Sequence, residues 1–411
     1  MLENDPEADA LKAAVAALSA RLLNLGLEGA HFSDLLEVFC TGLNGFGAGL
    51  MRVHVTLRAH HPEFGSIAHR WRRDDGTESQ TFNHIYTPRR EWVSSPLYYL
   101  SENNISEIRQ RLTDPDPVLD FPFFDELRAS GGTDYIALKV FFFAPGDNLA
   151  IDPNHAPEGC LISLTGDGPD GFSEQHLQAA RDLLPSLLLA LKSNANHQMA
   201  TDIAATYLGR DAGARVLSGD IIRGSVQHID AVICYFDLSG FTKISEALGG
   251  EDIVEMLNDY FCITVDVIEN HGGNVLKFMG DGMLAVFDVQ KNKDANRAAI
   301  EAAAALRREM KLVSDRRAAE GLTGTGFTLA LHSGEVLYGN IGGRTRLDFT
   351  VIGPAVNTTA RLSAMTAHVD QNIVISARVA RPLLETRDDL VSLGWYRLRG
   401  VRERQELFTL D

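Results

Sequence analysis

The sequence predicts an α/β domain followed by an α+β domain, and two observations support that prediction. Segments with apolar residues at helical spacing alternate along the chain with short runs that are apolar throughout or at every second residue. A stretch interrupted by glycines, residues 195–228, separates two blocks that are each long enough for a hydrophobic core. We therefore expect a first domain over residues 1–194, a helical linker over 195–228 and a second domain over 229–411.

The composition is that of a soluble globular protein, with 45% hydrophobic and 23% charged residues. The formal net charge of −17 argues against nucleic acid or an anionic membrane as a partner, because such surfaces are bound through clustered Lys and Arg. The N-terminus lacks the basic and apolar regions of a signal peptide, and no apolar run approaches the roughly 20 residues that cross a bilayer. We expect a cytoplasmic protein without membrane insertion.

The cysteines lack the spacing of a metal site or of a disulfide framework. They are Cys40, Cys160, Cys234 and Cys262, and each stands among apolar residues. We interpret all four as reduced core residues.

The first domain begins with predicted helices and continues with predicted strands. Helices are expected over residues 8–27, 32–43 and 177–191, and strands over 50–57, 66–71, 78–86, 135–143 and 159–165, with a long irregular insert before the fourth strand. The first helix has an apolar stripe made of Leu11, Val15, Leu18, Leu22 and Leu25. Such a stripe indicates either a docking helix or half of a dimer interface.

This order of elements, closed by Gly171-Phe172-Ser173-Glu174-Gln175 and a leucine-rich helix, resembles a GAF-like α/β sensory domain. The resemblance implies an effector, which the sequence does not name and which we expect to be a small molecule or another ligand. Metal or haem ligation by its histidines is the weaker interpretation, because the adjacent His60 and His61 would point to opposite faces of a strand. The linker is predicted as a long helix from Ala195 with glycine breaks, either a spacer or a two-state element that transmits a signal.

In the second domain, two aspartates follow predicted strands. The apolar run 232–236 ends at Asp237, just before a turn and a helix, and the strand 274–279 leads into the tight turn that carries Asp281. An aspartate at the end of a strand most often caps a helix or forms a turn. Two such carboxylates beside one helix N-terminus also suit a polyphosphate with divalent cations.

A third segment, residues 347–362, favours polyphosphate and cation binding over a purely structural role for the two aspartates. It has a strand to Ile352, then Gly353 and Pro354, where a helix accepts proline at its first position. Asn357 and Arg361 are then spaced i, i+4 on one helical face. Other expected helices span 252–271 and 294–320, and other strands span 283–287, 328–332, 336–341, 349–352 and 373–376, mostly in antiparallel pairs.

Together these segments resemble the catalytic domain of class III nucleotidyl cyclases, the adenylate and guanylate cyclases, over about residues 229–410. The resemblance implies a ferredoxin-like core and two Mg²⁺ or Mn²⁺ ions per site. It assigns the metal to Asp237, Asp281 and the Leu238 carbonyl, the purine to Lys277 and Thr350, and the ribose and transition state to Asn357 and Arg361. In the family these groups meet across a dimer interface, so we expect a homodimer.

The triphosphate is expected at the start of the helix after Asp237, where backbone amides face an anion. The residues are Ser239, Gly240, Phe241 and Thr242, with a further basic residue from the C-terminal strands. Arg399, Arg402 and Arg404 compete for that role, and we favour Arg399.

ATP is the expected substrate, because guanylate cyclases usually carry Glu and Cys where this chain has Lys277 and Thr350. Thr350 replaces the common Asp, as in cyclases similar to the bicarbonate-responsive subgroup, and Pro354 replaces a common Asp or Asn. A guanylate cyclase and a nucleotide-binding regulatory module without turnover are the alternatives, and the complete set of motif residues disfavours the second. Neither a P-loop motif nor a diguanylate cyclase motif occurs.

Overall fold

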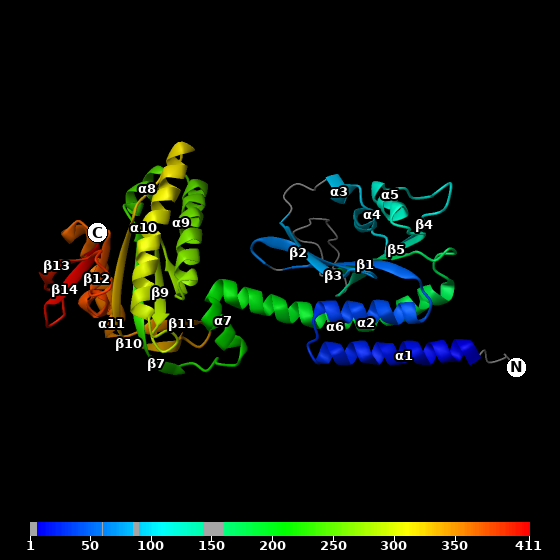
Figure 1. The fold of residues 1–411 in the computed structure, drawn as a ribbon, viewed down its shortest axis with the longest axis horizontal. Coiled ribbons are helices and arrows are strands. Elements are labelled where there is room, and N and C mark those ends of the chain that lie inside the picture. The colour runs from blue at the N-terminus through cyan, green and yellow to red at the C-terminus, as the bar shows by residue number, and fades with distance from the viewer. Residues whose placement is uncertain (1–5, 60, 85–89, 143–158) are drawn as a thin grey trace. The chain divides into compact units, whose positions relative to one another are not determined.

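The computed structural model describes residues 6–59, 61–84, 90–142 and 159–411, which form two compact units, Met1–Ile203 and Ala204–Asp411 (Figure 1). His60 and the predicted strand ends at residues 85–86 and 143 lie outside the described residues. Each unit is described separately below.

The first unit is built on one antiparallel sheet of six strands in the order β3-β2-β1-β6-β5-β4. The strands are β1 (Leu50–Arg58), β2 (Phe64–Arg72), β3 (Gly76–Asn83), β4 (Glu107–Arg111), β5 (Asp134–Phe141) and β6 (Gly159–Gly166). The helices are α1 (Pro6–Leu27), α2 (Phe32–Gly45), α3 (Arg90–Val93), α4 (Pro96–Glu102), α5 (Pro122–Ala129) and α6 (Glu174–Leu208). The expected mixture of helices and strands is confirmed, whereas the GAF-like resemblance stays a prediction.

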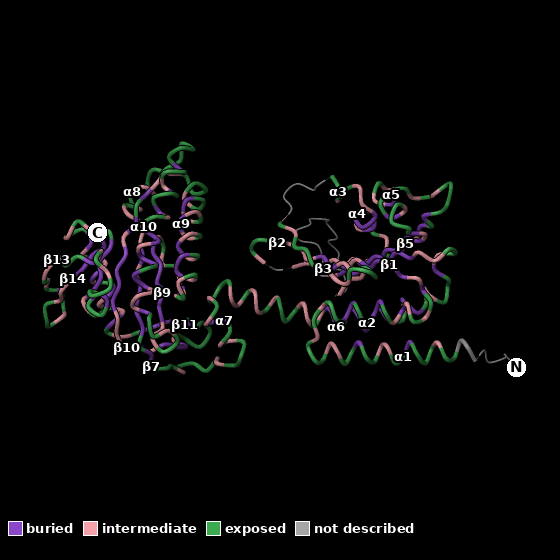
Figure 2. The backbone as a smooth tube through the Cα atoms, viewed as in Figure 1, coloured by how far each residue is buried: buried purple, intermediate pink, exposed green. Residues whose placement is uncertain are grey.

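Helices α2 and α6 lie on one face of this sheet, and α1 packs against them on the side away from the sheet (Figures 1 and 2). Together they bury the main core. Val53, Val55 and Leu57 of β1 contribute to it from the sheet. The apolar stripe of α1 joins the same core, since Val15 and Leu22 are buried there. The stripe therefore docks on the chain's own helices.

The insert before β5 is not irregular, which corrects our expectation. It contains α3, α4, β4 and α5, and α4 and α5 cover the second face of the sheet with a separate apolar cluster. Proline opens both helices, and the Ser95 hydroxyl accepts a hydrogen bond from the Tyr98 amide at 3.1 Å. These elements span only four to eight residues, too few for a hydrophobic period to stand out in the sequence.

Helix α6 runs without a break past residue 194, where we had placed the start of the linker. No glycine or proline interrupts the sequence there, and Pro185 lies within the helix. A turn at Gly209 (φ +84°) then leads to α7 (Arg210–Leu217). A Cβ at Gly209 would lie 2.7 Å from the Val275 carbonyl oxygen, so this close approach to the second unit's sheet requires glycine.

The second unit has an eight-stranded sheet in the order β13-β14-β12-β10-β7-β9-β8, with β11 paired to β10. The strands are β7 (Val226–Leu238), β8 (Asn274–Met279), β9 (Gly282–Asp288), β10 (Phe327–Gly342), β11 (Leu347–Ile352), β12 (Ile373–Ser376), β13 (Leu390–Tyr396) and β14 (Gln405–Leu410). The helices are α8 (Phe241–Ala247), α9 (Gly250–Asn270), α10 (Ala295–Ala319), α11 (Pro354–Ser363), α12 (Thr366–Val369), α13 (Ala377–Ala380) and a 3₁₀ turn (Arg381–Leu383).

Strand β10 is continuous, whereas we had predicted two strands separated at residues 333–335. It pairs with β7 along thirteen residues, Phe327 to Gly339, and this ladder holds Ser333 and Gly334 in an extended conformation. Pairing is antiparallel except between β10 and β12. Helices α9 and α10 bury the main core against the sheet, and α7 and α11 contribute to a smaller cluster.

Two expectations from the sequence need correction, one about a cysteine and one about membrane-spanning helices. Cys40, Cys160 and Cys234 are buried, but Cys262 is exposed on α9 and is not a core residue. Among the described residues one helical segment, Asp9–Leu27, is long and apolar enough to cross a bilayer, with a mean hydropathy of 1.4 and 11% of its window buried. We had expected no such segment. The observation rests on length and composition alone, which core helices of soluble proteins share.

Candidate active site

Asp237 stands near the end of β7, a strand held on both sides by neighbours. It lies opposite Gly282 of β9 and Thr328 of β10. A Cβ at Gly282 would come within 2.8 Å of the Asp237 Oδ1 atom, so glycine leaves the room that this carboxylate occupies.

Asp281 is carried by the two-residue turn between β8 and β9. Gly280 takes the left-handed conformation (φ +68°) at the first turn position, as the tight hairpin requires. The Leu238 amide donates a hydrogen bond to the Asp281 carbonyl oxygen at 3.2 Å. This bond fixes the turn beside the end of β7, so the structure brings Asp237 and Asp281 together.

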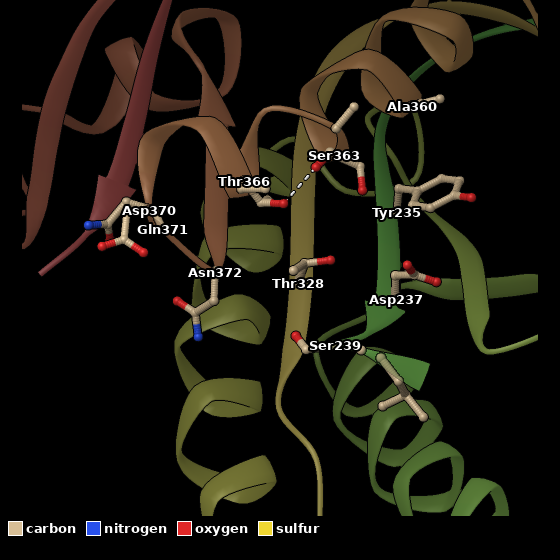
Figure 3. Close-up of a pocket in the computed structure, with 14 residues that line it drawn as sticks. Tyr235, Asp237, Ser239, Thr328, Ala360, Ser363, Thr366, Asp370, Gln371 and Asn372 are labelled. Atoms are coloured by element: carbon tan, nitrogen blue, oxygen red, sulfur yellow. Dashed lines mark hydrogen bonds between the residues drawn. The ribbon is translucent and has the colours of Figure 1, made fainter. Parts of the chain in front are cut away.

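The electrostatics of this pair suit a cation. Burial, together with the charge of Asp281, raises the pKa of Asp237 from 3.8 to about 6. Burial and the same two carboxylates also raise the pKa of Tyr235, whose side chain extends to the same side of β7 as Asp237 (Figure 3). Neither aspartate has an ion-pair partner within the described chain. Two carboxylates and a carbonyl fit the oxygen preference of Mg²⁺ or Mn²⁺, although the described residues hold no cluster of three or more His, Cys, Asp or Glu.

An open cavity of about 800 Å³ lies beside this strand end (Figure 3). One wall is the segment from Asp237 to Gly240, and the opposite wall includes Ser363 of α11, Thr366 of α12 and Asn372. The cavity therefore joins the metal-side residues to the C-terminal end of α11.

The predicted triphosphate segment forms the start of α8. Ser239 is anchored on both sides, because its amide donates to the Gly326 carbonyl at 2.9 Å and its carbonyl accepts from the Thr325 hydroxyl at 2.6 Å. Gly240 precedes the helix in the left-handed conformation (φ +68°), and Phe241 and Thr242 occupy its first turn. Amides of a first helical turn lack partners within the helix.

Lys277 and Thr350 lie on β8 and β11, outside the cavity beside Asp237. The Lys277 ammonium forms an ion pair with Asp348 at 2.9 Å, and Asp348 is a residue that the sequence reasoning missed. Its position two residues before Thr350 on one strand, hence on the same face, could have indicated it. Thr350 is buried, and its hydroxyl has no hydrogen-bond partner among the described residues.

Asn357 and Arg361 lie on α11, which begins at Pro354 as expected. Asn357 is exposed, and Arg361 lies against Gly400, where a Cβ would come within 3.3 Å of its Nη2 atom. Arg399 is exposed beside that glycine. Neither Asn357 nor Arg361 lines the cavity beside Asp237, although every residue of this unit is described. One chain thus keeps the predicted catalytic residues apart from that cavity.

Comparison with known proteins identifies the second unit. The family model described as "Adenylate and Guanylate cyclase catalytic domain" matches residues 225–411. An adenylate cyclase of Anabaena cylindrica is 34% identical over 155 residues, which cover 37% of this chain and 30% of that protein. An uncharacterized protein of Mycobacterium tuberculosis is 28% identical over 208 residues, 50% of this chain and 36% of that protein. The chain thus spans about a third of the length of these curated relatives.

Solved cyclase structures also align with part of this chain. The adenylyl cyclase CyaB from P. aeruginosa is 25% identical, and the alignment covers 46% of this chain and 96% of that one with a TM-score of 0.42. The guanylyl cyclase Cya2 is 29% identical, with coverages of 45% and 93% and a TM-score of 0.41. On the match to the family model, residues 225–411 belong to the family of adenylate and guanylate cyclase catalytic domains.

Proposed function

We propose that residues 225–411 convert ATP into 3′,5′-cyclic AMP and pyrophosphate, at two sites shared between the subunits of a homodimer. The observation that carries this proposal is the juxtaposition of Asp237 and Asp281, two carboxylates without a cationic partner beside an open cavity. Such a pair can bind divalent cations, which in turn bind a phosphate-bearing substrate.

Asp237, Asp281 and the Leu238 carbonyl would hold two Mg²⁺ or Mn²⁺ ions. When bound, such ions lower the pKa of the ribose 3′-hydroxyl and neutralise charge on the triphosphate. The 3′-oxygen forms a bond to the α-phosphorus, the bond from that phosphorus to the bridging oxygen breaks, and pyrophosphate leaves while the hydroxyl proton passes to water. No protein base is required.

The other residues bind and orient the substrate. The Arg361 guanidinium would donate to the α-phosphoryl oxygens as their charge grows, and Asn357 would orient the ribose. Backbone amides of Gly240, Phe241 and Thr242, beside Ser239, would bind the β- and γ-phosphates, with Arg399 as an additional cation.

The base would be read by Lys277 and Thr350. The Lys277 ammonium can donate to a purine ring nitrogen, and the buried Thr350 hydroxyl can accept from the adenine amino group. Asp348 holds Lys277 and would set its direction. Similarity to an adenylate cyclase of Anabaena cylindrica also supports ATP over GTP.

The separation of the two residue sets supports the homodimer. A second chain would bring its own Asn357 and Arg361 to the cavity of the first, and two-fold symmetry would complete both sites. We further propose that the first unit sets the rate of this reaction through α6 and α7, which lead from one unit to the other. Equal rates per active site for the full chain and for residues 224–411, under every ligand tried, would contradict this control.

Product analysis tests the proposed reaction. The purified chain is incubated with ATP or with GTP at equal concentration and with Mn²⁺, and the nucleotides are separated and identified by mass spectrometry. We expect cyclic AMP and pyrophosphate in equal amounts, and no product from the Asp237→Asn variant. More cyclic GMP than cyclic AMP would identify a guanylate cyclase, whereas neither product would favour a nucleotide-binding regulatory module.

A further inference from the structure

The sheet of the first unit carries a polar patch on the face opposite α1, α2 and α6. Paired residues of neighbouring antiparallel strands share a face, and here they form two adjacent cross-strand rows. The first row is Arg72, Arg52, Thr165 and Tyr135, and the second is Glu78, Arg70, His54 and Ser163. We call these eight residues the Arg52 face.

The Arg52 face contains most of the unpaired buried polar atoms of the described chain. Seven buried side-chain nitrogen or oxygen atoms lack a hydrogen-bond partner among the described residues, and four of them belong to this face. These four are Arg52 Nη1, His54 Nδ1, Arg70 Nε and Thr165 Oγ1. Buried polar atoms in folded proteins nearly always have partners, so a cluster of exceptions indicates that a partner is missing.

The missing partner is negatively charged. Arg52 is only 8% exposed and has no ion-pair partner within the described chain. Glu78 is the single carboxylate of the face, and it pairs with Arg70 at 2.7 Å near the exposed edge. Burial and the charges of Arg70 and Arg72 lower the pKa of Arg52 to about 10, although the charge of Glu126 on α5 opposes this shift. Burial and the charge of Arg52 lower the pKa of His54 to about 3. Glu126 thus acts on Arg52 without forming an ion pair with it. A buried cation without a direct ion-pair partner is costly, and a bound anion would reduce that cost.

The surroundings of Arg52 restrict the kind of anion. The Phe123 ring of α5 lies 5.1 Å from the Arg52 Cζ atom and continues into the apolar cluster of α4 and α5. The fully buried Thr165 hydroxyl stands opposite Arg52 in the adjacent strand. The buried Nη1 atom and this hydroxyl both lack a partner among the described residues, so each can donate to one oxygen of a carboxylate. The apolar wall suits a carbon skeleton rather than a free phosphate ion.

We propose that the Arg52 face is a binding site for a small organic carboxylate. The carboxylate would accept hydrogen bonds from Arg52 Nη1 and Thr165 Oγ1, and its apolar body would pack against Phe123. Arg70 Nε and His54 Nδ1 would bind a second polar group of the ligand. This site belongs to the first unit and goes beyond the cyclase reaction proposed for residues 225–411.

The test is titration of the full chain, at fixed ionic strength, with benzoate, succinate or citrate and separately with inorganic phosphate. Isothermal calorimetry gives affinity and stoichiometry, and thermal unfolding gives stabilisation. We expect at least one carboxylate to bind at one site per chain and to raise the midpoint of unfolding. Binding of phosphate alone, or of none of the carboxylates, would overturn the proposal.

Two variants assign the binding to this face. Arg52→Met removes the buried charge but keeps a long side chain, and we expect at least tenfold weaker binding together with an unliganded unfolding midpoint no lower than that of the unsubstituted chain. Arg21→Met, on the exposed side of α1, changes net charge equally and should bind normally. Thr165→Val removes only the hydroxyl and should weaken binding several-fold, which keeps the test decisive if Arg52→Met does not fold. Unchanged affinity in both Arg52→Met and Thr165→Val contradicts the proposal.

Discussion

The two units of this chain each contain charge that the described protein leaves without a counter-charge, but the signs are opposite. In the second unit Asp237 and Asp281 lie together beside an open cavity, and neither has a cationic partner. In the first unit Arg52 is buried and forms no ion pair with any described residue. In both units the charge that lacks an ion-pair partner among the described residues is opposite in sign to the ligand that we propose there.

The two sites also differ in how completely one chain builds them. The Arg52 face is assembled within a single sheet, so its donors are fixed relative to one another by strand pairing. The aspartate pair is fixed in the same way by β7 and β9, but Asn357 and Arg361 lie on α11 and outside the adjacent cavity. The first site should therefore function in one subunit, and the second should require two.

The largest expected effect tests that requirement. Asp237→Ala and Arg361→Ala should each lower cyclase activity by about 10²-fold or more, because the first removes a ligand of the proposed metal ions and the second removes a donor to the reacting phosphate. Mixed in equal amounts under conditions of subunit exchange, the two chains should recover about a quarter of the unsubstituted rate. Half of the dimers are then mixed, and each has one of its two sites intact. The measurement is the rate of cyclic nucleotide formation before and after exchange.

Mixing each variant with itself provides the control and should give no recovery. Formation of mixed dimers is verified independently with distinguishable tags. If mixed dimers form and activity stays at background, the shared site is wrong and one chain must contain a complete site.

A smaller effect concerns the free energy of unfolding, and it tests whether the charge of Asp237 destabilises the protein when no metal is bound. The folded pKa of Asp237, about 6, lies above its ordinary 3.8, so the folded state binds the proton more tightly than the unfolded state does. The contribution of this group to stability therefore falls as pH rises from about 4 to 6. With divalent metal removed, Asp237→Asn should stabilise the protein at pH 7.5 by about 1 kcal/mol, a value reduced for the partial exposure of the group. Thermal unfolding at pH 7.5 and pH 5 should show the gain shrinking at the lower pH.

Asp266→Asn, an exposed position on α9, removes the same charge and should change the midpoint little at either pH. Added Mn²⁺ should reverse the ranking, because the unsubstituted chain binds the ion and Asp237→Asn does not. An equal gain at both pH values would show that the carboxylate pair is not the cause.

The smallest expected effect is on binding of the purine base of ATP. Asp348→Asn removes the ion pair with Lys277, which is partly exposed and so is worth under about 1 kcal/mol. We expect KM for ATP to rise about threefold with kcat nearly unchanged, as measured by initial rates. Asp315→Asn breaks a similar 2.9 Å pair with Lys311 on α10 and should leave both constants unchanged. A hundredfold loss of kcat would instead give Asp348 a direct part in the chemistry.

Secondary structure was predictable where the hydrophobic pattern was long. The helix of α1 appears where its pattern placed it. The segments α4, β4 and α5 were missed because each is short and gains its stability from packing on β5. The predicted break in β10 at Ser333-Gly334 was wrong because pairing with β7 outweighs the local preference for a turn.

The sequence by itself determined the two aspartates that we assign to the metal, because both positions depend on local sequence. Asp237 lies at the end of an apolar strand, and Asp281 lies in a turn that begins with Gly280. Only the tertiary structure decided which charges have partners. The pairing of Lys277 with Asp348 joins residues 71 positions apart, and the Arg52 face is assembled from β1, β2, β5 and β6. Partnership in space depends on strand order and register, which local sequence does not encode, and so the unpaired Arg52 could be recognised only in the folded sheet.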